Sequence, residues 1–215
     1  TGVAVTAIDR GAMLVTLEDG RELAYDALLM APGAEPRHLP IAGSDQPHVL
    51  YLRTLEDSRS IITALEHVDQ AIVVGAGFIG LEVAASLRQR EVAVTVIAPE
   101  DLPLAPVIGE TLGRFVQNLH EDQGVSFLLG RTVSEIRSDE VVLDDGTTVP
   151  ADLVVIGAGV IPRTALAEPA GERHEGFTLA PISHDRQAGT ASRQLPTVSV
   201  IEAATVWPLV ILISV

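Results

Sequence analysis

The chain has 215 residues, of which 47% are hydrophobic and 20% are charged, so it can bury a core and is expected to form one large domain or two small ones. Its 29 acidic and 14 basic side chains give a formal net charge of −15, which repels nucleic acid and anionic membrane surfaces. It contains 0 cysteines, which excludes a disulfide, a thiolate metal site and a cysteine redox pair, so any redox chemistry requires a bound cofactor.

The distribution of residues adds further expectations. No apolar run approaches the roughly 20 residues that span a bilayer, and the apolar stretch 206–215 is interrupted by Pro208 and is expected to be a buried strand. The 6 histidines lack metal-ligand spacing, so no metal site is predicted. We therefore expect a cytoplasmic protein with neither a nucleic-acid nor a membrane partner.

The first copy of a duplicated pattern lies in residues 5–37. Alternating strand residues lead to a Glu-Asp-Gly turn at 18–20, a second strand, the apolar run 27–30 and then Gly33. Acidic-glycine turns connect antiparallel strands, and a fully apolar run is typical of a strand inside a parallel sheet. This segment predicts an antiparallel meander followed by one interior strand.

Residues 54–68 are predicted to form a helix. Thr54 is a suitable N-cap, and Asp57 stands three residues later. The apolar residues that share one side of this helix are Leu55, Ile61, Ile62 and Leu65. We expect the helix to pack against the protein and not to serve as a loose linker.

A glycine-rich loop follows the apolar run 71–74, which suits a central parallel strand. The loop consists of Gly75, Ala76, Gly77, Phe78, Ile79 and Gly80. In a dinucleotide-binding loop the first glycine permits a tight turn, the second lets amides approach the pyrophosphate, and the third allows helix and strand to pack closely. Strand, loop, helix and a second strand at 93–97 occur in the required order, so nucleotide binding is predicted. The alternative is that these glycines serve packing alone.

The acidic residue expected to hold the ribose of NAD is missing. Such a residue normally ends the second strand, about 20 residues after the loop, and binds the ribose hydroxyls. Ala98 occupies this position, and Glu100 or Asp101 can replace it only if the turn bends back. No arginine follows Ile97 to hold a 2′-phosphate, so NADH is favoured, although NADPH is not excluded.

Glu82 has two interpretations. A carboxylate in the first turn of a helix stabilises the helix dipole. The same position is also expected to face the nicotinamide side of the site. The sequence leaves both open.

A further helix is predicted near residue 115. Its apolar positions at i, i+3, i+4 and i+7 are Leu112, Phe115, Val116 and Leu119. Gly124 stands where a C-terminal cap is expected.

The second copy of the duplicated pattern lies in residues 133–163. Its acidic-glycine turn ends at Gly146 and its apolar run is 153–156, and the offsets 146 − 20 and 159 − 33 both equal 126. Gly157, Ala158 and Gly159 are expected at the carboxyl edge of the sheet, where ligands bind, and a simple strand-ending turn is the alternative. Since 75 − 126 is −51, we expect the nucleotide loop of the first copy to lie before Thr1.

Together these residues resemble the flavoproteins with two dinucleotide-binding domains, especially the ferredoxin or rubredoxin reductases of oxygenase systems and the apoptosis-inducing-factor-like oxidoreductases. The resemblance covers about residues 3–166. Its most specific marks are residues 25–34, residues 51–57, the glycine loop with Glu82, and residues 151–162.

The resemblance implies an α/β fold, in which a Rossmann-like NAD-binding domain with a parallel sheet and an antiparallel β-meander is attached to a partial FAD-binding domain. The implied domains are a remnant of the FAD-binding domain at 1–45, an NAD(P)-binding Rossmann domain at 46–165, and an irregular or return segment at 166–215. FAD and NAD(H) are the implied cofactors. The implied reaction is hydride transfer from NADH to FAD, with an iron–sulfur carrier protein as the partner.

The resemblance also implies roles for single residues. Ala31 and Gly33 would pack on FAD, Arg53 would lie near the flavin and nicotinamide, and Glu82 would contact the carboxamide. No side-chain acid or base is required, because the flavin carries the chemistry. For Arg53, an exposed surface position is the alternative.

The sequence departs from this family in two places. Pro32 replaces a threonine that can serve the flavin, and the Ala-Gly-Asp motif that holds the ribityl chain is absent, the nearest segment being Ile-Glu-Ala-Ala at 201–204. We therefore expect this chain alone to bind FAD poorly, and a truncated NAD(H)-binding module without catalytic activity is the alternative function. A dehydrogenase with a single Rossmann domain does not explain the repeat, and the chain has no lysine for its catalytic set.

Overall fold

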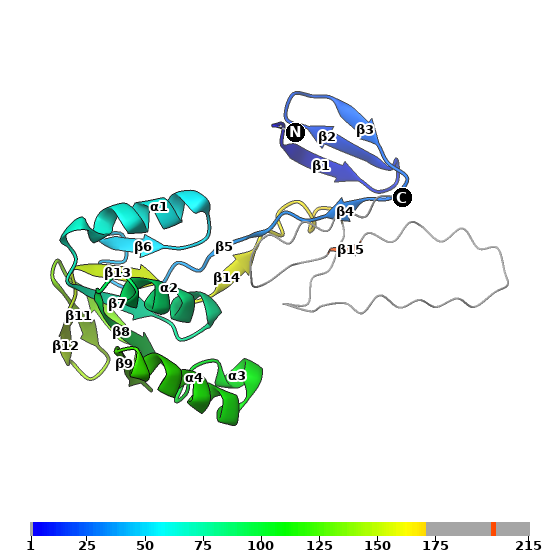
Figure 1. The fold of residues 1–215 in the computed structure, drawn as a ribbon. Coiled ribbons are helices and arrows are strands. Elements are labelled where there is room, and N and C mark those ends of the chain that lie inside the picture. The colour runs from blue at the N-terminus through cyan, green and yellow to red at the C-terminus, as the bar shows by residue number, and fades with distance from the viewer. Residues whose placement is uncertain (1, 171–198, 201–215) are drawn as a thin grey trace. The chain divides into compact units, whose positions relative to one another are not determined.

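The computed structural model describes residues 2–170 and 199–200 of the chain (Figure 1). Two compact units can be distinguished, the first formed by Thr1–Glu35 and Pro162–Val215 and the second by Pro36–Ile161. Each unit is described by itself.

The second unit is built on a five-stranded parallel sheet. Its strands, in spatial order, are β6 (Val49–Tyr51), β13 (Leu153–Ile156), β7 (Gln70–Val74), β8 (Ala93–Ala98) and β9 (Val125–Leu129). All four neighbouring pairs are parallel. A strand that is buried on both faces has a continuous run of apolar residues. Strand β13 is such a strand, because each of its residues is buried. The sheet confirms the predicted α/β class and the predicted central strands.

Helices cover one face of this sheet. They are α1 (Leu55–Ala64), the 3₁₀ helix η1 (Leu65–His67), α2 (Phe78–Arg88), α3 (Ala105–Ile108) and α4 (Glu110–Asp122). Helix α2 packs on β7 and β8, α1 lies beside β6, and α4 lies beside β9. Val83, Ala84 and Leu87 of α2 share a buried cluster with Val73 and Val96 of the sheet.

The opposite face of the sheet is covered by an antiparallel meander. It consists of β10 (Val133–Ile136), β11 (Glu140–Leu143) and β12 (Thr148–Pro150). Ile136 and Val141 of the meander share a core cluster with Ile72 and Val154 of the sheet. The predicted meander of the second copy is therefore confirmed, and it forms a layer of the core.

The first unit contains the matching meander of the first copy. Its strands are β1 (Val5–Asp9), β2 (Leu14–Leu17) and β3 (Glu22–Ala24), followed by β4 (Leu29–Met30). Strand β4 pairs in parallel with β15 (Ser199–Val200). Leu29 is 64% exposed, so the prediction of an interior strand is wrong for this copy. Strands β5 (Ala34–Pro36) and β14 (Val160–Pro162) pair where the chain passes between the units.

The division between the units differs from the expected boundary at residue 45. Leu39 and Ile41 pack against the core beneath the meander, and the amide of Ile136 donates to the carbonyl of Ala42 over 2.8 Å. These contacts place residues 36–45 in the second unit. At the other boundary, residues 162–165 belong to the first unit and not to the second.

The predicted helices form, but some of the apolar residues predicted to lie on a buried side of a helix are exposed. Thr54 and Asp57 make a reciprocal capping box at the start of α1, which confirms the predicted N-terminus. Ile61 is buried, whereas Leu55 is 68% and Ile62 49% exposed, so these two do not share its buried side.

Helix α4 shows the same difference. Leu112, Phe115 and Leu119 are exposed, and the buried position is Gly113. A Cβ on Gly113 would lie 2.7 Å from the carbonyl oxygen of Pro103, so this glycine allows the helix to approach loop 102–104 closely. The helix therefore packs through its Gly113 side, and the prediction that Leu112, Phe115 and Leu119 form its buried side is wrong.

The segment expected at 166–215 is described only in part. Leu166 and Ala167 pack in a small cluster with Met30 of β4, and β15 adds a short strand that was not predicted. The rest of the segment predicted to be irregular, and the strand predicted at 206–215, lie outside the described residues.

Candidate functional site

The carboxyl ends of four parallel strands meet at one edge of the sheet. Ile156 is the register partner of both Tyr51 and Val74, and Val74 is the partner of Ile97. The segments that follow these strands therefore lie side by side at this edge, and they are 52–53, 157–159, 75–80 and 99–101. Parallel α/β sheets bind ligands outside this edge, where connections leave in opposite directions.

The glycine loop is a tight turn that requires glycine at its first and third glycine positions, Gly75 and Gly80. Gly75 has a φ of 110°, and its amide donates to the carbonyl of Ile97 over 2.8 Å. A Cβ on Gly80 would lie 2.0 Å from the carbonyl oxygen of Gly75. The first and third glycines therefore hold the strand, the turn and helix α2 in backbone contact.

The second glycine of the loop faces open space. Gly77 is the N-cap of α2. Among the described residues, no side chain caps this helix end, and none lies within 4 Å of a Cβ built on Gly77. The amides of the first helical turn have no partner within the helix, and they carry the positive end of its dipole. An open backbone surface at such a helix end fits a pyrophosphate group.

Gly157 closes this cluster from the neighbouring strand. Its amide donates to the carbonyl of Val74 over 2.8 Å, and a Cβ on Gly157 would lie 3.1 Å from the Cα and N atoms of Gly80. The sequence placed Gly157 at this edge but contained no sign of its contact with helix α2. Gly159 has a φ of 91° and accepts a hydrogen bond from the amide of Arg37. A ligand contact of residues 157–159 stays a prediction.

Glu82 is the fifth residue of α2 and is exposed. The first turn of this helix contains no acidic residue, so the interpretation of Glu82 as a first-turn dipole carboxylate is wrong. The contact with the nicotinamide carboxamide stays a prediction.

The end of β8 carries no carboxylate. Ala98 is 1% exposed and belongs to the core cluster under α2. Beyond it the chain bends back, because the amide of Leu104 donates to the carbonyl of Ala76 over 3.2 Å. Glu100 is exposed and its carbonyl accepts a hydrogen bond from the amide of Gly130 over 3.1 Å. Ribose binding by Glu100 stays a prediction.

An arginine beside this strand end was missed by the sequence reasoning. The amide of Arg131 donates to the carbonyl of Ala98 over 3.0 Å. Arg131 follows β9, 33 positions after Ala98, since 131 − 98 is 33. Only the pairing of β8 with β9 brings the two residues together.

Arg53 lies at the start of α1. Its side chain is exposed, and its amide donates to the Asp57 carboxylate over 2.9 Å. Nearby, the ring centroids of His38 and Tyr51 are 4.4 Å apart, and the Tyr51 hydroxyl is buried. Burial raises the pKa of Tyr51, and the Leu39 backbone acts in the opposite direction. The sequence predicted a role for Arg53 but missed this ring pair.

Asp152 positions the strand that leads into the glycine loop. Its Oδ2 accepts hydrogen bonds from the amides of Asp69 at 3.0 Å and Gln70 at 2.9 Å. These amides begin β7, so the carboxylate anchors that strand beside β13. The duplicated pattern contains Asp152, but its spacing alone did not indicate this contact.

Ala31 and Gly33, the residues predicted to pack on FAD, follow β4 in the first unit. Ala31 is exposed. Gly33 has a φ of 76°, and its carbonyl accepts a hydrogen bond from the amide of Arg163 over 3.0 Å. Their contact with a flavin stays a prediction.

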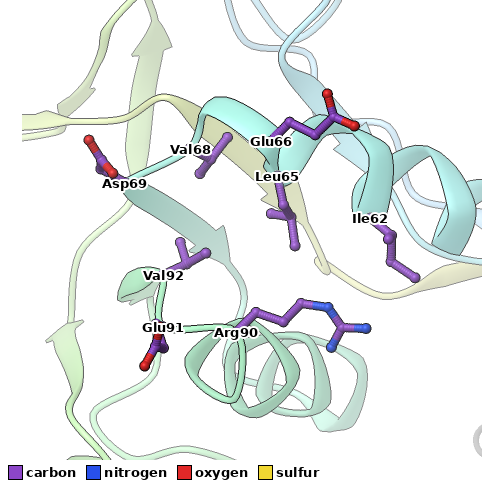
Figure 2. Close-up of a pocket in the computed structure, with 8 residues that line it drawn as sticks. All are labelled: Ile62, Leu65, Glu66, Val68, Asp69, Arg90, Glu91 and Val92. Atoms are coloured by element: carbon purple, nitrogen blue, oxygen red, sulfur yellow. The ribbon is translucent and has the colours of Figure 1, made fainter.

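A pocket of about 420 Å³ lies at the opposite edge of the sheet. Its residues come from the end of α1, η1 and the segments before β7 and β8, and Figure 2 shows Leu65, Val68 and Val92 directed toward one another there. This is the amino edge of the parallel strands, away from the glycine loop. The pocket is therefore separate from the candidate dinucleotide site.

The described part of the chain shows neither a membrane-spanning helix nor a metal-binding cluster. None of its helices has the length and apolar character needed to cross a bilayer. Among the same residues, no three histidine, aspartate or glutamate side chains are grouped to bind a metal ion.

The parallel sheet, the open helix end and the glycine cluster define a Rossmann dinucleotide-binding unit. Residues 1–180 match the family model of the pyridine nucleotide-disulphide oxidoreductases. The chain belongs to this family.

Individual relatives agree with the family match. The chain is 39% identical over 180 residues to putidaredoxin reductase from Pseudomonas putida, an alignment that covers 79% of this chain and 43% of that protein. It is 33% identical over 214 residues to apoptosis-inducing factor 3 from Mus musculus, covering 97% and 34%, respectively. A solved ferredoxin reductase from Rhodopseudomonas palustris is similar with a TM-score of 0.76 and 34% identity, covering 81% and 45%. The chain thus spans less than half the length of these relatives.

Proposed function

We propose that this chain is the NAD(H)-binding part of a FAD-dependent NAD(P)H oxidoreductase, which transfers a hydride from NADH to FAD and passes the electrons to a ferredoxin- or rubredoxin-type carrier. The observation that carries the proposal is the open backbone at Gly77, beside glycines 75, 80 and 157, which leave no space for a Cβ. The named relatives support the reaction and the type of acceptor.

The residues of the second unit bind and orient the dinucleotide in this proposal. The amides at the start of α2 hold the pyrophosphate, and Glu82, on the same helix, holds the carboxamide of the nicotinamide. In the overall reaction NADH becomes NAD⁺, two molecules of a one-electron carrier are each reduced by one electron, and one proton is released. No side chain has to donate or accept a proton for this balance. When bound, FAD supplies the hydride acceptor that separates the electron pair.

Gly77→Ala tests the dinucleotide site. Gly77 has an extended backbone, with φ −81° and ψ −177°, and a Cβ there meets no residue that the structure describes, so we expect an unchanged thermal unfolding midpoint. The added methyl group stands where the pyrophosphate must approach, so the Kd for NADH, measured by isothermal titration calorimetry, should rise at least about tenfold.

Gly11→Ala is the matched control, because a Cβ on Gly11 makes only an ordinary contact of 3.4 Å with Asp9. This variant should bind NADH as the unaltered chain does. Tight NADH binding by Gly77→Ala would show that the glycine loop is not the site.

A second candidate is an NAD(H)-binding module without catalytic activity. Pro32 in place of threonine and the absence of an Ala-Gly-Asp motif at 201–204 favour it, because both changes remove groups that serve the flavin. Bleaching of added FAD by NADH in the presence of the chain, followed by reduction of an artificial electron acceptor, separates the candidates. Bleaching faster than in a protein-free control supports the oxidoreductase, and NADH binding without bleaching supports the module.

A further inference from the structure

The duplicated acidic-glycine turn has different partners in its two copies. In the first copy, Asp19 pairs with Arg21 of the same turn over 2.8 Å. In the second copy, Asp145 pairs over 2.7 Å with Arg131, which belongs to another segment. Asp144 lies 3.9 Å from the same guanidinium group. The amide of Asp144 also donates to the carbonyl of Thr132 over 2.9 Å, which holds the turn against the segment of Arg131.

Arg131 lies beside the strand end at which Rossmann domains recognise a 2′-phosphate. Its amide donates to the carbonyl of Ala98, the last residue of β8. The adenosine ribose binds at this strand end in Rossmann domains, and an arginine nearby accommodates the 2′-phosphate of NADP. An arginine therefore reaches this place from the loop after β9, although none follows β8 directly.

The charge at this strand end is nevertheless acidic. Glu100 and Asp101 are exposed, as are parts of Asp144 and Asp145, whose side chains are 46% and 34% accessible. Hydrogen bonds from Thr147 lower the pKa of Asp145, which is therefore ionised at neutral pH. Four carboxylates and one guanidinium group give a local charge of 1 − 4, or −3.

We propose that this chain selects NADH over NADPH by electrostatic exclusion, an inference that rests on the NAD(H)-binding function proposed above. Asp144 and Asp145 engage the guanidinium group of Arg131, and Glu100 and Asp101 repel the 2′-phosphate. Ala98 occupies the place of the usual ribose-binding carboxylate. The proposed selection therefore does not depend on such a carboxylate.

This form of selection depends on ionic strength. Exposed charges are screened over a Debye length of about 8 Å at physiological salt, and over shorter distances at higher salt. The NADPH-to-NADH ratio of Kd values should therefore fall as salt is added.

The test measures both Kd values by isothermal titration calorimetry with the 215-residue chain. We expect NADPH to bind about tenfold more weakly than NADH at low salt. Asp144→Asn with Asp145→Asn releases Arg131 and should lower the ratio about three- to tenfold, since exposed pairs contribute modestly. Adding Arg131→Gln to this double variant should reverse most of that decrease in the NADPH-to-NADH ratio of Kd values.

The matched control carries Glu18→Gln and Asp19→Asn, the corresponding changes in the first copy of the turn. It removes the same net charge, but from the first unit, and should leave the ratio unchanged. A ratio of two affinities on one protein is insensitive to a misfolded fraction, which reduces the active concentration for both ligands alike.

The remaining outcomes overturn the proposal. Equal affinities for NADH and NADPH, or a ratio unchanged by Asp144→Asn with Asp145→Asn, refute electrostatic exclusion while leaving dinucleotide binding intact. An equal change of the Kd ratio in the control variant would mean that net charge, and not the release of Arg131, causes the effect. Failure of both dinucleotides to bind refutes the proposed function, and this inference with it.

Discussion

The two meanders of this chain share a strand order but differ in burial. Both are antiparallel sheets of three consecutive strands, and both contain a register irregularity near the start, between Val5 and Ala7 in one and between Val133 and Glu135 in the other. Val5 is 39% exposed, whereas its structural counterpart Val133 is 8% exposed. The same pattern of residues therefore forms the same strand pairs in two different environments.

The neighbours of each copy explain this difference. The second meander covers a five-stranded sheet whose strand β13 has parallel partners on both sides, and Val155 of β13 is completely buried. Its counterpart in the first copy, at 155 − 126, is Leu29, which is 64% exposed on β4. Alternation and turn residues specify which strands pair, while burial also requires a second layer to pack against.

The largest expected effect comes from replacing isoleucine by alanine at two matched positions, one in each meander. Ile136 is 1% exposed in the core of the second unit, and Ile8, its counterpart in register, is only partly buried. Ile136→Ala should lower the free energy of unfolding by about 2–5 kcal/mol, the usual range for a buried isoleucine. Ile8→Ala should lower it by less than about 1.5 kcal/mol, because a partly exposed site leaves a smaller cavity.

Urea denaturation followed by circular dichroism measures both losses. Equal losses would mean that the two meanders contribute alike to their units and would contradict the assigned difference in burial.

A second test compares the aspartates that precede the apolar runs, Asp26 and Asp152, which are 126 positions apart since 152 − 26 is 126. Asp152 accepts two backbone amides at the start of β7. Asp152→Ala should lower the free energy of unfolding by about 1–2 kcal/mol, because charge-assisted hydrogen bonds stabilise more than neutral ones.

Asp26→Ala is the matched control. Asp26 is exposed, and we expect a change within about 0.5 kcal/mol. Hydrogen exchange at Asp69 and Gln70 should accelerate in Asp152→Ala alone. Unchanged protection of these two amides would contradict the anchoring role of Asp152.

The smallest expected effect concerns the capping box of α1, a feature of the second unit. Partial burial acts to raise the pKa of Asp57, but hydrogen bonds from Thr54 and Arg53 prevail and lower it below the ordinary 3.8. A lowered pKa stabilises the fold above the ordinary value, and this contribution is lost as the pH falls through the folded-state value.

The measurement is the stability difference between the unaltered chain and Asp57→Asn at several pH values. We expect a difference of less than about 1 kcal/mol at pH 7, because the site is partly solvated, and its disappearance at about pH 2. A difference that persists in acid would mean that the Asp57 carboxylate charge does not stabilise the helix.

Local patterns in the sequence predicted the elements that local geometry determines. Thr54 and Asp57 mark the start of α1 because a cap involves residues three positions apart. The apolar run before Gly75 and the spacing of the loop glycines predicted the strand, turn and helix of the dinucleotide unit, since their conformations depend on few neighbours. The 126-residue repeat likewise predicted both meanders.

The sequence by itself thus determined the fold class, the family and the place of the glycine loop. Tertiary structure alone decided that Gly157 contacts Gly80, that Arg131 lies beside Ala98, and that Leu112, Phe115 and Leu119 of α4 face outward. These features depend on which strands become neighbours and how closely layers approach. Such contacts join residues far apart in the chain, and no short-range spacing encodes them.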